Sequence, residues 1–130
     1  MPMRLNTLSA VSGIVFALGF AVVSQGAVAD AATVTTAVPA EVMEEGAALY
    51  KKNCRFCHGT NGTSGKRLAG NEMLADSDYV ATVILTGPGY MTPFEEHLSD
   101  EEIALITTYV RNAWGHAYGP MQADDVAQLR

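Results

Sequence analysis

The sequence predicts an all-α domain in which three helices surround a centre that their own side chains do not fill. Apolar residues recur at helical spacing in residues 40–53 and 99–115, and no segment shows the apolar–polar alternation of a strand. Long stretches rich in glycine and proline separate these segments and favour loops. A domain of this size has few apolar side chains for a core and often needs a disulfide, metal or cofactor.

Residues 1–29 have the pattern of a secretory signal peptide. Arg4 precedes an apolar run over 10–23, and residues 27–29 (Ala-Val-Ala) fit the rule for cleavage, with residues 29–31 as a second possible site. The run is shorter than the roughly 20 residues that span a bilayer as a helix. We therefore expect export to the periplasm and no membrane span after cleavage, with an uncleaved anchor as the alternative.

The mature chain divides into a lead-in, a domain and a tail. Residues 30–39 are small and polar and should form a flexible lead-in, residues 40–115 the domain, and residues 116–130 a tail that packs on the domain or trails it. The segments expected after the lead-in are a helix over 40–53, a glycine-rich loop over 59–71, a short helix over 78–86, a turn segment over 87–98, a long helix over 99–115 and one helical turn within 124–129.

Several residues mark where the expected helices begin and end. Asp76 or Ser77 is suited to cap the short helix, and Gly87 to stop it. The long helix begins with the capping-box pattern Ser99-x-x-Glu102, and Gly115 is expected to end it.

The whole chain carries a formal net charge of −6. Nucleic-acid binding depends largely on basic side chains that neutralise phosphates. We therefore expect no nucleic-acid partner.

The motif Cys54-Arg55-Phe56-Cys57-His58 contains both cysteines of the chain. In an exported protein this C-x-x-C-H spacing predicts covalent attachment of one c-type haem. Two thiols one helical turn apart can form thioethers with the two vinyl groups, and the adjacent histidine can bind the iron as the proximal ligand. The predicted fold is then three or more helices wrapped around one covalently bound haem.

Two other uses of a C-x-x-C motif are alternatives. A dithiol–disulfide site normally lies within a thioredoxin-like βαβ fold, and no strand pattern is present. A zinc site would need further ligands at metal spacing, and there is no second C-x-x-C.

With this motif following an amphipathic helix, the chain resembles class I cytochromes c over residues 40–115. In that family the first and last helices cross near the haem, and Gly46, Tyr50 and Tyr109 resemble the residues at the crossing. The resemblance implies that a methionine on the loop before the last helix supplies the second iron ligand. It also implies a proline carbonyl that accepts from the proximal histidine; here Lys66 or Arg67 would stand in that place.

The sixth ligand must be chosen from several side chains of the mature chain: Met43, Met73, Met91, Met121, His97 and His116. Met91 fits best, because it lies in Gly-Tyr-Met-Thr-Pro-Phe (residues 89–94), which resembles the family's ligand loop and directly precedes the last helix. A bis-histidine site through His97 or His116 is the alternative, although both are expected to face solvent. The expected dry pocket is lined by Phe56, Leu68, Tyr79, Val83, Leu85, Tyr90 and Phe94.

Ligation by His58 and Met91 leaves no iron position for a substrate. We therefore expect a one-electron carrier and not an enzyme, with a haem enzyme or gas sensor as the alternative class. Residues 109–115 and 125–130 resemble the end of cytochrome domains that accompany bacterial periplasmic dehydrogenases. The expected partners are such a dehydrogenase as donor and a cytochrome or terminal oxidase of the respiratory chain as acceptor.

Overall fold

The computed structural model describes residues 37–130, which form helices and loops and contain no strand. The predicted signal peptide and most of the lead-in lie outside the described residues. The elements are, in order, α1 (Ala40–Asn53), α2 (Arg55–His58), the 3₁₀ turn η1 (Glu72–Ala75), α3 (Ser77–Thr86), α4 (Asp100–Asn112) and α5 (Ala123–Ala127). The all-α prediction is confirmed.

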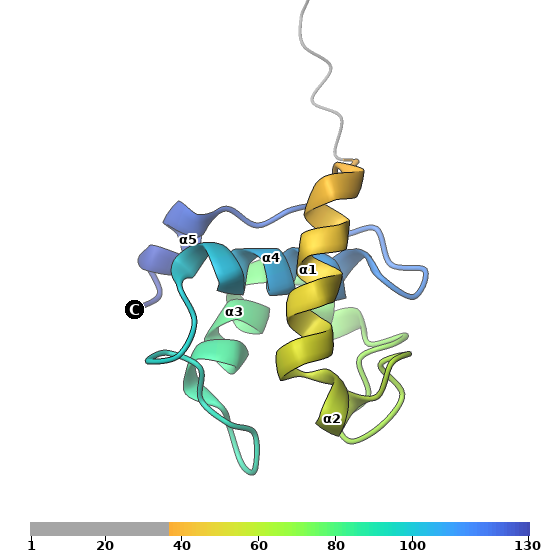
Figure 1. The fold of residues 1–130 in the computed structure, drawn as a ribbon, viewed down its shortest axis with the longest axis horizontal. Helices are drawn as coiled ribbons and strands as arrows, with labels where there is room; N and C mark the ends of the chain where they lie inside the picture. The colour runs from red at the N-terminus through yellow and green to blue at the C-terminus, as the bar shows by residue number, and fades with distance from the viewer. Residues whose placement is uncertain (1–36) are drawn as a thin grey trace, which may run out of the picture. The chain divides into compact units, whose positions relative to one another are not determined.

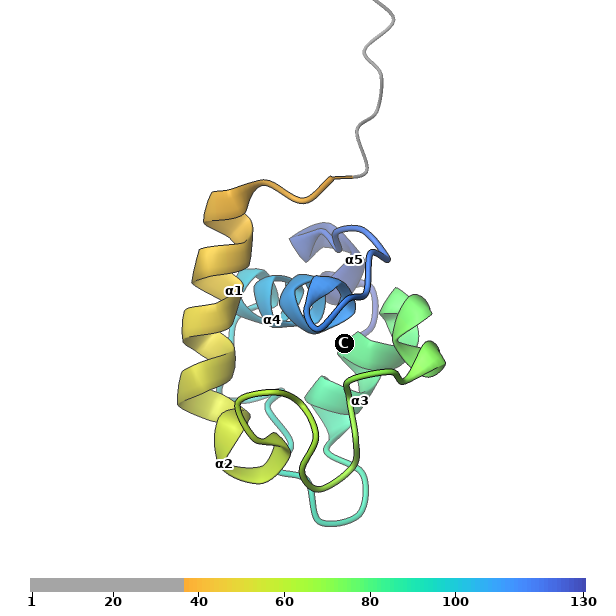
Figure 2. The ribbon, with the colours of Figure 1, turned by 90° about the vertical axis from the view of Figure 1, so that its right-hand side faces the viewer.

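Helices α1 and α4 cross closely, as Figures 1 and 2 show. Gly46 makes this approach possible, because an added Cβ there would lie 2.5 Å from the carbonyl oxygen of Leu105 and 2.8 Å from Cβ of Tyr109. The Tyr50 and Tyr109 rings meet beside the crossing with centroids 5.3 Å apart. These are the residues that the resemblance to class I cytochromes c indicated for a helix crossing.

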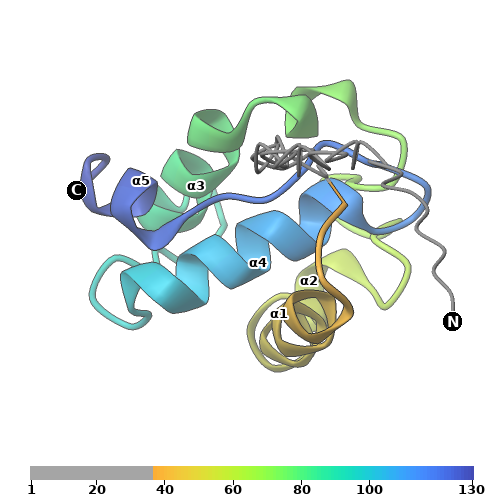
Figure 3. The ribbon, with the colours of Figure 1, turned by 90° about the horizontal axis from the view of Figure 1, so that it is seen from above.

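Helix α3 lies on the other side of α4 from α1, as seen from above in Figure 3. The Asp76 side chain accepts from the backbone N–H of Tyr79, and Gly87 ends the helix in a left-handed conformation. Ser99 and Glu102 form the predicted capping box at the start of α4. The starts and stops of both helices therefore follow from local capping chemistry, with one exception.

The exception is the end of α4, which lies at Asn112 and not at Gly115. Ala113 is extended, and Trp114 has a φ of +55°. The Asn112 amide donates to the carbonyl of Gly119, whose N–H donates back to the Asn112 side chain. These bonds to the following segment turn the chain before Gly115.

Residues 116–130 pack on the helices. Val126 of α5 and the preceding Met121 are both buried. Arg111, which is only 5% exposed, also binds this segment. Its guanidinium donates to five backbone carbonyls, those of Leu74, Ala75, Tyr118, Gly119 and Pro120. Burial lowers the pKa of Arg111, and the nearby carboxylates of Asp76 and Asp78 oppose that shift.

Among the helices of residues 37–130, none combines the length and the apolar character needed to cross a bilayer.

Candidate functional site

The site begins where α1 ends. The Cys54 N–H donates to the Tyr50 carbonyl, and the N–H groups of Cys57 and His58 both donate to the Cys54 carbonyl. The chain therefore makes one tight turn, α2, that presents Cys54, Cys57 and His58 to one cavity. Cys54 is buried and Cys57 is exposed. Burial raises the pKa of the Cys54 thiol to about 11, with a smaller contribution from Cys57.

The His58 ring is oriented by the loop that follows it. Its Nδ1 lies 2.9 Å from the carbonyl oxygen of Lys66. A carbonyl oxygen only accepts, so Nδ1 carries the proton and Nε2 is free to bind a metal. Of the two residues that the sequence offered for this contact, Lys66 makes it.

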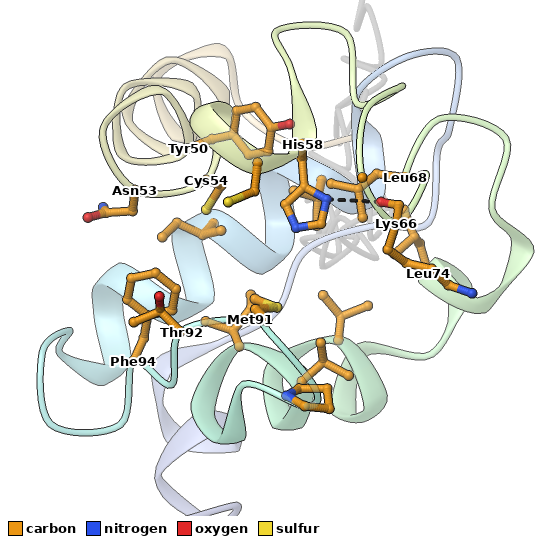
Figure 4. A pocket seen from close by; sticks show the side chains of 18 of the residues that line it. Tyr50, Asn53, Cys54, His58, Lys66, Leu68, Leu74, Met91, Thr92 and Phe94 are labelled. Carbon is orange, nitrogen blue, oxygen red and sulfur yellow. Dashed lines mark hydrogen bonds between the residues drawn. The ribbon is translucent and has the colours of Figure 1, made fainter.

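The cavity has a volume of about 590 Å³ and reaches from α2 to the loop that bears Met91. Figure 4 shows His58 and Met91 on opposite sides of it, with both side chains directed into the space between them. The wall between these two sides is mainly apolar. It includes Leu68, Leu74, Val80, Val83, Ile84, Phe94, Ile106 and Val110.

The Met91 loop folds tightly onto its own beginning. Gly87 has a φ of +56°, and a Cβ there would lie 2.4 to 2.6 Å from backbone atoms of residues 91–93. The Phe94 N–H reaches the end of α3, where it lies 3.1 Å from the carbonyl of Ile84. The loop is thus closed at its base, and Met91 faces the cavity in a half-buried position.

The other candidates for an iron ligand lie away from this cavity. Met73 is 54% exposed, whereas Met121 is buried in the core beside α5. His97 is exposed. His116 is half-buried, contrary to the expectation that it faces solvent, because its Nε2 accepts from the N–H of Gly70 at 3.0 Å.

Five of the seven predicted pocket residues line the cavity, although one of them, Tyr90, is fully exposed; Phe56 and Leu85 do not line it. Phe56 is 99% exposed, because the turn of α2 directs the cysteines and the histidine inward and leaves the residue between them outside. Leu85 is buried in the core and does not line the cavity. Val80 and Ile84 also line the cavity, and their spacing with Tyr79 and Val83 on one short helix could have indicated them from the sequence.

These residues fit a haem on chemical grounds. Two thiols and an imidazole with a free Nε2 share one wall, and a thioether faces them across an apolar space. Such a set matches the covalent and axial attachments of a c-type haem. The arrangement also keeps charged side chains largely out of the cavity, as a buried porphyrin requires.

Comparisons with known proteins agree with this assignment of the site. Residues 41–110 match the sequence family described as cytochrome c oxidase, cbb3-type, subunit III. The cytochrome c subunit of a quinone alcohol dehydrogenase from Gluconobacter oxydans is 35% identical over an aligned span of 104 residues, and the match covers 65% of this chain and 22% of that protein. The cytochrome subunit of fructose dehydrogenase from Gluconobacter japonicus is 34% identical over an aligned span of 107 residues, and the match covers 66% of this chain and 22% of that protein.

The chain thus spans less than a quarter of the length of these relatives. Among solved structures, that of cytochrome c6C from Synechococcus matches with a TM-score of 0.50 and 27% identity. The match covers 55% of this chain and 98% of that protein, and it supports a class I cytochrome c fold.

Proposed function

Because the chain belongs to the cytochrome c family described as cytochrome c oxidase, cbb3-type, subunit III, we propose that it is a one-electron transfer protein with a single covalent haem c. One observation supports this above the others. The cavity has Cys54, Cys57 and His58 on one side and Met91 on the other. Of the candidate second ligands within residues 37–130, Met91 is the one that lines this cavity.

We assign each residue a separate task. Cys54 and Cys57 would hold the haem through thioethers, and His58 and Met91 would bind its iron from opposite sides. The bound haem supplies the one-electron chemistry. The chain fixes the His58 ring through the Lys66 carbonyl and surrounds the cavity with apolar side chains that exclude water.

A carrier function follows from this ligand set. Met91 comes from a loop whose base is closed by the approach of Gly87 to the backbone of residues 91–93, and this limits the backbone freedom of the residue that bears the thioether. With both axial positions taken by side chains, no site remains for a substrate on the iron. The protein would then pass electrons and perform no catalysis of its own.

The relatives suggest the electron donor. The matched proteins are cytochrome subunits of alcohol, fructose and gluconate dehydrogenases. We propose that this chain receives electrons from such a dehydrogenase in the periplasm and passes them to a cytochrome or terminal oxidase of the respiratory chain. The export pattern of residues 1–29 supports the location.

The first test concerns attachment of the haem. Haem should remain with the purified holoprotein after acid–organic extraction and on a denaturing gel, because two thioethers would hold it. Cys54→Ala and Cys57→Ala should each weaken this retention, whereas Met73→Ala, on the exposed face of η1, should not change it. Haem that extracts freely from the wild-type holoprotein would overturn the proposal.

The second test concerns the iron ligands and separates a carrier from an enzyme or sensor. The ferric protein should show the weak absorption band of a methionine–iron bond near the red end of the visible spectrum. Met91→Ala should abolish this band and lower the reduction potential, and Met73→Ala should do neither. Carbon monoxide should leave the spectrum of the reduced wild-type protein unchanged; rapid and complete conversion would support an enzyme or sensor.

A further inference from the structure

Arg130 binds the segment that joins the Met91 loop to α4. Its Nη1 donates to the carbonyl of Glu95, its Nη2 donates to the carbonyl of Leu98 at 2.8 Å, and its Nε pairs with the Asp100 carboxylate. One guanidinium therefore has three acceptors within six consecutive residues. The planar fork of arginine suits this arrangement, and a lysine ammonium could not reproduce it.

The Met91 loop has few other attachments. Within residues 37–130, the one backbone hydrogen bond donated from residues 88–93 is internal, from the Met91 N–H to the Pro88 carbonyl. The loop is attached to the rest of the domain at its two ends. At its N-terminal end, Gly87 lies close to the backbone of residues 91–93.

At the C-terminal end of the loop, the peptide groups form hydrogen bonds with two different parts of the domain. The N–H groups of Phe94 and Glu95 donate to carbonyls at the end of α3, at 3.1 to 3.3 Å. The Glu95 carbonyl, facing away, accepts from Arg130. Phe94 also lines the cavity beside Met91. A shift of this segment would therefore move both the cavity wall and the base of the ligand loop.

Arg130 reaches this segment because α5 is anchored in the core. Val126 is fully buried, and Leu129 packs against the same core from its edge. Neither α5 nor Arg130 lies within residues 41–110, which match the family. The three groups that Arg130 binds lie within the matched residues, so Arg130 connects the C-terminal segment to the matched domain.

We propose that Arg130 is a positioning residue for Met91: by holding residues 95–100 it keeps the thioether directed into the cavity. This inference rests on the proposed role of Met91 as an iron ligand. Arg130 does not line the cavity; it would act through the backbone of Glu95 and Leu98.

The test is displacement of Met91 by added imidazole in the ferric holoprotein, followed through the red absorption band. Imidazole competes with the thioether, so a looser loop raises the apparent imidazole affinity. Arg130→Ala should raise it about tenfold, the equivalent of losing one charge-assisted hydrogen bond. Arg130→Lys should give an intermediate rise. Glu44→Gln removes an exposed charge from α1 and should leave the affinity unchanged.

Asp100→Asn serves as a second variant, because it removes the ion pair and leaves the two carbonyl acceptors to Arg130. It should raise the affinity less than Arg130→Ala does. If Arg130→Ala yields too little folded protein, the imidazole affinities of Arg130→Lys and Asp100→Asn are compared with that of the wild type instead.

An unchanged imidazole affinity in the arginine variants would overturn the inference, even if their resistance to urea falls, since Arg130 would then stabilise the fold without positioning Met91. A wild-type protein that lacks the red band would instead overturn the proposed ligation by Met91, and with it this inference.

Discussion

The His58 imidazole and the Lys66 carbonyl are joined by a hydrogen bond with an Nδ1–oxygen distance of 2.9 Å. The acceptor belongs to the main chain, so the Lys66 side chain takes no part in orienting the ring. What places this carbonyl is the turn before it, where Gly65 has a φ of +55°. A Cβ at Gly65 would lie 2.8 Å from the carbonyl oxygen of Cys57.

Gly65→Ala should therefore raise the reduction potential of the holoprotein. The added methyl group pushes the loop away from Cys57 and weakens the bond from His58 to Lys66, which lowers the basicity of the imidazole. A left-handed alanine should also reduce the free energy of unfolding by about 1–2 kcal/mol. Redox titration and urea unfolding measure the two effects.

Gly115→Ala is the matched control, since Gly115 has a φ of +90° and open space around it. It should cost similar backbone strain and leave the potential unchanged. Equal potentials in the two variants would show that the loop does not control the His58 bond.

Local signals in the sequence predicted much of the fold. The helical spacing of apolar residues and the caps at Asp76, Gly87, Ser99 and Glu102 are short-range features, and the structure contains all of them. Met91, which lines the cavity, was indicated by the resemblance of residues 89–94 to the family's ligand loop and by the place of that loop directly before the last helix.

Features that depend on distant contacts could not be predicted. In the sequence, Arg111 has no feature that distinguishes it from a surface residue at the end of a helix. In the structure it is buried, because its guanidinium donates to carbonyls of η1 and of residues 118–120. Likewise α4 ends at Asn112 because Gly119 pairs with the Asn112 side chain. The sequence did not distinguish Lys66 from Arg67 as the residue whose carbonyl accepts from His58, because a glycine-rich loop has no periodic pattern that fixes its conformation.

Gly46→Ala should lower the free energy of unfolding by about 1–3 kcal/mol, as expected for overpacking of a close contact. In an exposed helix this substitution would instead stabilise by up to about 1 kcal/mol. The sign reverses because the methyl group would press against the Leu105 carbonyl and Tyr109. Urea unfolding of the holoprotein measures the change.

Ala48→Ser on the exposed face of α1 is the control and should change stability by less than about 0.5 kcal/mol. A Gly46→Ala variant as stable as the wild type would contradict the close crossing of α1 and α4.

Tyr50 should make stability depend on pH in the alkaline range. Its hydroxyl donates to the Gly59 carbonyl at 2.7 Å, and burial raises its pKa from 10.0 to about 12, with smaller contributions from Cys54 and Tyr109. Because the folded-state pKa is raised, this contribution is complete below pH 10 and is lost as the pH rises through about 12.

Tyr50→Phe should cost about 1 kcal/mol at neutral pH, through loss of the hydrogen bond. Its stability should fall less steeply than that of the wild type between pH 10 and 12. The difference between the two curves of melting temperature against pH isolates Tyr50, because other alkaline transitions occur in both proteins. Parallel curves would show that the phenol does not ionise on unfolding.

The basic side chains of the described residues are unevenly distributed. Arg111 is buried among carbonyls and Arg130 is paired with Asp100. The others are exposed and lie along the proposed haem-attachment segment and the loop after it: Lys51, Lys52, Arg55, Lys66 and Arg67. Acidic residues cluster instead after the Met91 loop, at Glu95, Glu96, Asp100, Glu101 and Glu102. We expect a locally positive field beside the cysteines in a protein whose net charge is negative.

Oxidation of the reduced holoprotein by ferricyanide tests this expectation with a definite sign. The negative net charge alone predicts that added salt speeds the reaction, because it screens repulsion of the anion. A positive field at the site of electron exit predicts the opposite, a rate that falls with ionic strength. We expect the fall, and we expect a redox partner with an acidic patch to dock beside residues 51–56.

Lys51→Gln combined with Lys52→Gln should flatten or reverse this salt dependence. Ala127→Glu combined with Gln128→Glu changes the net charge by the same amount at the C-terminal end of α5 and should leave the salt dependence unaltered, because screening confines the effect of a charge to roughly 10 Å at 0.1 M salt. If both double variants shift the rate equally, net charge governs the reaction. Lys51 and Lys52 would then do no more than complement the dipole at the end of α1.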